Sequence, residues 1–119
     1  MVNQRQQILN LLGLARRAGQ LVTGEGTVLT AIQKGQLKLV FIASDVGSST
    51  GKKINDKCQS YGVEVVNNFS RFEISQSIGQ ARTIIGVTGT GFAKKIHQLI
   101  TKLNEGEWAY GQRKNLWIS

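Results

Sequence analysis

The sequence predicts an α/β fold: a three-layer α-β-α sandwich around a small four-stranded mixed sheet. Two short runs rich in apolar, β-branched and aromatic residues, 37–43 and 83–88, are typical of strands covered on both faces. Segments with the apolar spacing of helices alternate with these runs and with two shorter candidate strands. Because helices and strands alternate along the chain, we expect helices on both faces of the sheet.

The N-terminal part of the chain predicts a helix and then a short strand. Over residues 4–18 the apolar residues recur at i, i+3, i+4 and i+7, as in an amphipathic helix. Asn3 can cap the start of this helix, and Gly19 can end it. A strand over residues 20–23 follows.

A pair of glycines leads into the second helix, which we expect over residues 27–34. Gly24 and Gly26 stand before an apolar-periodic segment, so they predict a tight loop that opens a helix. A helix start offers unpaired N–H groups and a positive dipole end, which suit a phosphate, and glycines let the backbone approach a ligand closely. An ordinary strand–turn–helix joint explains the same pattern, because short glycine motifs are not specific.

Two further helices are expected in the middle of the chain. The first covers residues 51–61 and precedes a short strand over 63–66. Ser70 and Glu73 have the spacing of a capping box, which predicts a fourth helix that ends near Ile78.

The C-terminal part of the chain predicts a last helix over residues 91–103. Residues 104–119 have no clear period, so we expect one domain over 1–103 followed by a C-terminal tail. The tail contains Trp108 and Trp117, which can dock on the domain or on a partner.

The charge of the chain indicates a polyanionic partner. Lys and Arg number 15 against 7 Asp and Glu, which gives a net charge of +8 and a pI near 10.1. Such a surface attracts nucleic acid through phosphate contacts and counterion release. The sequence contains no run of 18 apolar residues that could span a membrane. Residues 1–7 are too polar for a signal peptide, so we expect a cytoplasmic location.

The residues that carry most catalysis and metal binding are scarce. Cys58 is the only cysteine, so no intrachain disulfide and no Cys-based metal site are possible, and His97 is the only histidine. We expect Cys58 in the core and His97 solvated on a helix. Asp45 follows the central strand, where it can belong to a site or form an Asx-turn, and the turn is favoured. The sequence shows no set of catalytic or metal-binding side chains that would converge on one site. We therefore expect that the protein is not an enzyme and holds no metal or cofactor.

Two other glycine-containing joints imitate nucleotide-binding motifs. Segment 47–53 has only three residues between its glycines, and Lys53 stands where a P-loop needs Ser or Thr. Gly89 and Gly91 join a strand to a helix, but Lys94 occupies the position of the third glycine of a dinucleotide fingerprint. Neither joint therefore predicts nucleotide binding.

Several stretches of the chain, in their order, resemble the kink-turn-binding ribosomal proteins of archaea and eukaryotes. This family includes large-subunit protein "seven Ae", and the nearest likeness is to its small bacterial YlxQ-type members. The resemblance covers about residues 5–103. The resemblance is seen in six segments: Leu12–Gly19, Gly24 with the helix after it, Lys38–Asp45, Lys53–Cys58, Gly86–Thr88 and Gly91–Lys95.

The resemblance implies an α-β-α sandwich that binds sharply kinked RNA with tandem sheared G·A pairs. In the family a Gly-x-Asn-Glu-x-x-Lys motif at the start of the second helix touches the G·A bases and the backbone. Gly24 matches the first glycine, but the Asn, Glu and Lys positions hold Gly26, Thr27 and Thr30. Each missing base contact is worth about 1–3 kcal/mol.

The second family contact is the loop before the last strand, here residues 78–83. The resemblance implies that Ile78 packs against an extruded nucleotide and that Arg82 meets a phosphate. Together the candidate RNA-binding residues are Arg16, Arg17, Gly24, Glu25, Gly26, Thr27, Thr30, Lys34, Ile78, Gly79 and Arg82.

We therefore expect a non-catalytic, ribosome-associated protein that binds kink-turn-like RNA, either rRNA or another structured RNA, without a metal or cofactor. The alternative is a protein-interaction or assembly module whose basic face only keeps it soluble, which the missing Asn, Glu and Lys and the aromatic tail favour. A third hypothesis is the substrate-recognition half of an RNA-modifying enzyme.

Overall fold

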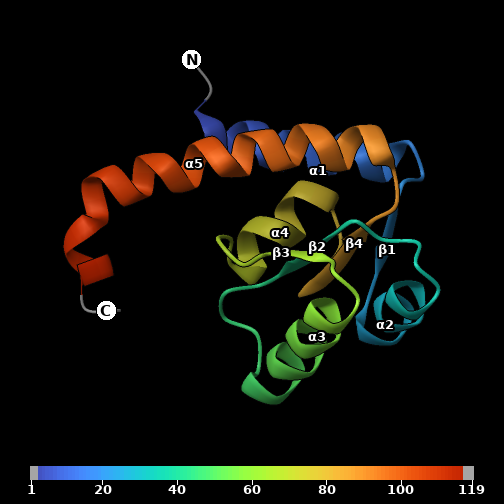
Figure 1. Cartoon of the computed structure of the whole chain (residues 1–119). Coiled ribbons are helices and arrows are strands. Elements are labelled where there is room, and N and C mark those ends of the chain that lie inside the picture. Colours follow the sequence, from blue (N-terminus) through green and yellow to red (C-terminus); the bar gives the residue numbers. More distant parts are fainter. Residues whose placement is uncertain (1–2, 117–119) are drawn as a thin grey trace.

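Helices and strands alternate throughout the chain, as the sequence predicts (Figure 1). The computed structural model describes the backbone of residues 3–116 and the side chains of residues 3–105. The elements are α1 Gln4–Arg17, β1 Leu21–Thr23, α2 Glu25–Gln33, β2 Leu39–Ile42, α3 Ser48–Ser60, β3 Glu64–Val66, α4 Arg71–Ile78, β4 Ile84–Val87 and α5 Thr90–Leu116.

The four strands form one mixed sheet in the order β1-β4-β2-β3. β4 is antiparallel to both β1 and β2, whereas β2 and β3 are parallel. We name the two ends of the sheet after Gln20 and Gly24, the residues on either side of β1. At the Gln20 end, β1, β2 and β3 start and β4 finishes, and the Gln20 carbonyl accepts a 3.0 Å hydrogen bond from the Thr88 N–H. At the Gly24 end, the Gly24 N–H donates to the Ile84 carbonyl at 3.0 Å.

Two hydrophobic clusters cover the two faces of the sheet. One packs α1, α4 and α5 against Leu39 and Phe41 of β2, and the other packs α2 and α3 against Val40 and Ile42. Figure 1 shows these two groups of helices on opposite sides of the sheet. Because β2 alternates between two apolar faces, its sequence is a continuous apolar run. Cys58 is fully buried in the second cluster, as expected.

The close packing of α1 against α4 depends on Gly13. A Cβ atom at this position would lie 2.9 Å from the Ser77 carbonyl oxygen, closer than side-chain carbons come to backbone. At the other end of the contact, the Arg5 guanidinium bonds Glu73 at 2.9 Å and lies 4.5 Å from the centre of the Phe69 ring. Glycine at one end and an ion pair at the other thus set how α4 lies on α1.

The predicted capping box at α4 is confirmed, and it also fixes the Glu73 carboxylate. Ser70 Oγ accepts from the Glu73 N–H at 3.2 Å, and Glu73 Oε1 accepts from the Ser70 N–H at 2.9 Å. Burial alone would raise the pKa of Glu73, but the Ser70 N–H, the Arg5 guanidinium and the Ser70 hydroxyl hold this pKa below its ordinary value of 4.5.

Three helix boundaries differ from the predicted ones by two residues or more. α2 begins at Glu25, and α3 begins at Ser48 because the Ser48–Thr50 stretch, predicted as loop, forms its first turn. α5 runs to Leu116 instead of ending near residue 103. Residues 104–116 contain no proline and several good helix formers, so the helix continues after its apolar period fades. The side chains of Trp108 and Trp117 lie outside the described residues, and the docking of the tail stays a prediction.

No helix in the described part of the chain combines the length and the apolar character that crossing a lipid bilayer requires.

Replacing Gly13 by Ala should destabilise the protein by about 1–3 kcal/mol, because the Ser77 backbone must move to make room. Gly26→Ala is the matched control. A Cβ there meets nothing within 4 Å, so this change should stabilise α2 by up to about 1 kcal/mol. Urea unfolding measures both free energies, and an equal gain from the two substitutions would contradict the packing described for α1 and α4.

The Glu73 cluster should give the protein an acid-sensitive component of stability. Because the pKa of Glu73 is lower in the folded chain, its contribution is complete above the unfolded value near 4.5 and is lost as the pH falls through the lower folded value. Glu73→Gln should therefore be less stable than the wild type at neutral pH, with a difference that shrinks in acid. Urea unfolding across this pH range tests it, and parallel curves for the two proteins would count against it.

Candidate nucleic-acid interface

The start of α2 is an open helix end held in place by β4. Gly24 has φ +93°, a backbone conformation that L side chains rarely adopt, and no side chain caps the helix at this position. Gly26 and Thr27 follow on the exposed surface, with Thr30 one turn later. Exposed N–H groups at the positive end of a helix dipole suit a phosphate or the edge of a base.

The loop between α4 and β4 is tied to the end of β1, next to Gly24. Ser75 Oγ accepts from the Arg82 N–H at 3.1 Å and donates to the Arg82 carbonyl at 3.2 Å. The Arg82 side chain donates to Thr23 Oγ1 at 3.3 Å and to the Ala81 carbonyl at 2.7 Å. Gly79 opens this loop as the left-handed cap of α4. The loop therefore presents Arg82 in a fixed position beside the start of α2.

The two segments meet around a hollow of about 210 Å³ that is lined by Gly24, Arg71, Ala81, Arg82 and Thr83. Arg71 and Arg82 supply positive charge, and the exposed Ala81 supplies a methyl group. An anion next to the open end of α2 would thus meet two guanidinium groups, which bind phosphate well.

Arg71 was not among the candidates from the sequence. The signal for it is the capping box, because the residue after Ser70 must occupy the first turn of α4. The Asp45 carboxylate holds this turn, since Oδ1 accepts from the Arg71 N–H at 2.8 Å. The sequence favoured a local Asx-turn at Asp45. In the structure the Asp45 carboxylate instead makes this longer-range contact, which joins the segment after β2 to α4.

Ile78 does not have the predicted position. Its side chain is 3% exposed and belongs to the core between α1 and α4, so it has no free surface for a nucleotide in this structure. Ile74 and Ile78 lie one helical turn apart and are both buried. Ala81 is the apolar side chain that the loop exposes in its place.

Glu25 belongs to the start of α2 but faces α3. Its Oε2 atom accepts from Lys53 Nζ at 3.0 Å, and its Oε1 atom lies 3.4 Å from Thr50 Oγ1. Lys53 thus balances the one carboxylate in the first turn of α2, so that its charge opposes an incoming phosphate less.

Arg16, Arg17 and Lys34 lie at the Gln20 end, away from the hollow. The two arginines end α1, and the chain then runs along β1 for about 13 Å before it reaches Gly24. Lys34 caps the far end of α2, again about 13 Å from the helix start. These side chains are close to Gly24 in the sequence but not in space.

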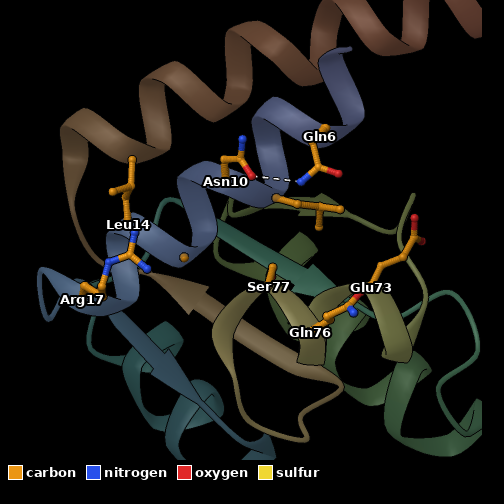
Figure 2. Close-up of a pocket in the computed structure, with 9 residues that line it drawn as sticks. Gln6, Asn10, Leu14, Arg17, Glu73, Gln76 and Ser77 are labelled. Atoms are coloured by element: carbon orange, nitrogen blue, oxygen red, sulfur yellow. Dashed lines mark hydrogen bonds between the residues drawn. The ribbon is translucent and has the colours of Figure 1, made fainter. Parts of the chain in front are cut away.

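A larger hollow, of about 610 Å³, lies between α1 and α4 (Figure 2). Figure 2 shows Gln6, Asn10 and Leu14 on α1 and Gln76 and Ser77 on α4, with a 2.9 Å hydrogen bond from Gln6 Nε2 to Asn10 Oδ1. Arg17 and Glu73 also line it, so its charges are mixed. It lacks the open helix end and the paired arginines of the Gly24 hollow.

His97 is exposed on α5, as the sequence predicts, and it also has a partner. Although its side chain is largely exposed, its Nδ1 atom lies 2.8 Å from Glu64 Oε1. Within the described residues, no group of three or more His, Cys, Asp or Glu side chains could hold a metal ion.

A model of the ribosomal protein L7Ae/L30e/S12e/Gadd45 family matches residues 6–97. The chain belongs to this family. The match covers most of α1 and every element after it as far as the first part of α5, so both segments that line the Gly24 hollow lie inside the matched region. As a member of this family, the chain is not an enzyme.

Individual relatives agree with this membership. The chain is 45% identical over 96 residues to the RNA-binding protein YlxQ of Enterococcus faecium, which is 81% of this chain and 93% of that protein. A solved structure of a Bacillus halodurans protein of unknown function has 46% identity and a TM-score of 0.77, with 80% of this chain and 97% of that one covered. The 15.5 kDa RNA-binding protein of Giardia lamblia, only 16% identical, shares the fold with a TM-score of 0.73 over 86% of this chain and 88% of its own.

Proposed function

We propose that this chain is a cytoplasmic, ribosome-associated protein that binds kink-turn-like RNA at the Gly24 end of its sheet. The observation that carries the proposal is the hollow in which the open start of α2 meets Arg71 and Arg82. The name of the Enterococcus faecium relative, an RNA-binding protein, and the net charge of +8 support it.

In this proposal the backbone does much of the recognition. Gly26 has no side chain, so only its N–H and carbonyl can meet a base edge, while Thr27 and Thr30 add hydroxyl groups. Arg71 and Arg82 neutralise the closely spaced phosphates of a sharp kink, and an unstacked nucleotide rests against Ala81. Irregular RNA of this kind exposes both unpaired bases and a distorted backbone.

A fluorescence-anisotropy titration tests the proposal. The probes are a kink-turn RNA and a matched duplex whose G·A pairs are replaced, each at two salt concentrations. We expect tighter binding to the kink-turn at both, because base edges at the start of α2 add to the phosphate contacts. Equal and steeply salt-dependent binding to both probes would reject kink-turn recognition and leave only phosphate attraction.

Restoring the family motif makes the same test more sensitive. Gly26→Asn, Thr27→Glu and Thr30→Lys together place the family side chains on exposed positions of α2, and a Cβ at position 26 has open space around it. The triple variant should bind the kink-turn more than tenfold tighter than the wild type, since each base contact contributes about 1–3 kcal/mol. The G·A-free duplex is the control, and an equal gain on both probes would contradict this placement of the bases.

A further inference from the structure

The Gln20 end of the sheet carries its own group of exposed cations. They come from the last turn of α1, the cap of α2, the residue before β2 and the first turns of α5. Figure 1 shows the end of α1 and the start of α5 together on one side of the molecule. The group consists of Arg16, Arg17, Lys34, Lys38, Lys94 and Lys95, all of which are exposed.

Little negative charge opposes these cations. At this end Glu64 is the nearby carboxylate, and it lies against His97. Elsewhere Glu25, Asp56 and Glu73 pair with Lys53, Lys52 and Arg5. Among the described side chains, no ion pair involves any of the six cations. Their positive charge is therefore available to attract an anionic ligand.

Two of these cations line a hollow, and an exposed aromatic ring lies at the same end of the sheet. Lys38 and Lys94 line a hollow of about 390 Å³, together with Gly62, with Thr90 at the start of α5 and with the paired Glu64 and His97. The Glu64 N–H donates to the Lys38 carbonyl at 3.2 Å, which fixes the start of β3 beside Lys38. Tyr61, directly before Gly62, ends α3 and is 50% exposed. An exposed ring at the same end of a domain as a group of cations is typical of surfaces that bind single-stranded nucleic acid.

We propose that the Gln20 end is a second RNA-binding surface, which takes a single-stranded segment through phosphates at Lys38 and Lys94 and a base stacked on Tyr61. This inference rests on the proposed function, because it assumes an RNA partner, but it uses none of the residues around Gly24. The Gly24 hollow and the Gln20 surface lie at opposite ends of the sheet, so one protein holds two segments of RNA at once.

The test uses a fluorescent 12-nucleotide oligouridine as the single-stranded probe and a kink-turn RNA as the second ligand. Lys38→Glu with Lys94→Glu should weaken oligouridine binding at least tenfold. The matched control, Lys52→Glu with Lys102→Glu, changes the charge equally at exposed sites away from the hollow and should weaken it far less. Equal losses in the two double variants would overturn the proposal in favour of diffuse attraction.

Substitutions of Tyr61 distinguish base stacking from charge attraction as contributions to oligouridine binding. Tyr61→Ala should weaken oligouridine binding about tenfold, and Tyr61→Phe, which keeps the ring, should bind like the wild type. Binding unchanged in Tyr61→Ala would overturn the stacking contact.

Competition shows whether there are two surfaces. A saturating amount of unlabelled kink-turn RNA should leave oligouridine bound, whereas displacement would mean one shared surface and overturn the inference. A protein that binds oligouridine through Lys38, Lys94 and Tyr61 but shows no preference for the kink-turn would instead contradict only the function proposed for the Gly24 end.

Discussion

The position of β4 between β1 and β2 is the constraint on which the candidate interface depends. The start of α2 and the loop before β4 are more than 50 residues apart in the sequence, yet both adjoin the first residue of β4. The bond from the Gly24 N–H to the Ile84 carbonyl fixes one segment, and the bonds of Arg82 to Thr23 and Ser75 fix the other. Backbone pairing, rather than a flexible loop, therefore sets the geometry of the hollow.

Most of the fold could be predicted because each element has a local signal. The alternating apolar faces of β2, the capping box at Ser70 and the glycines after the helices are all visible in the sequence. The end of α5 could not be placed in the same way, because its apolar period fades before its helix ends. Beyond that point intrinsic helix propensity is the remaining sequence signal, and it is weak.

The interface was only partly predictable, because closeness in the sequence is a poor guide to closeness in space. Arg16 and Lys34 flank Gly24 in the sequence, but β1 and α2 carry them to the other end of the sheet. Arg71 reaches the hollow only through the packing of α4, which the strand order determines. Ile78 illustrates a signal that was available, since its spacing from the buried Ile74 already places it on the inner face of α4.

Eight of the basic side chains lie at two ends of one sheet: Arg71 and Arg82 at the Gly24 end, and the six cations at the Gln20 end. At the Gly24 end they stand beside an open helix start, which suits a kinked backbone with exposed base edges. The Gln20 end also carries the exposed ring of Tyr61, which suits a single-stranded RNA segment. More than half of the 15 basic residues therefore belong to two separate surfaces.

The most direct test of the central claim is to map amide chemical shifts of the ¹⁵N-labelled protein as a kink-turn RNA is added. This account predicts that the largest changes fall on residues 24–27 and 81–83 and on Arg71, with smaller changes at the Gln20 end. If the largest changes instead fell on α3 or α5 while residues 24–27 stayed unperturbed, the Gly24 hollow would not be the site of kink-turn recognition.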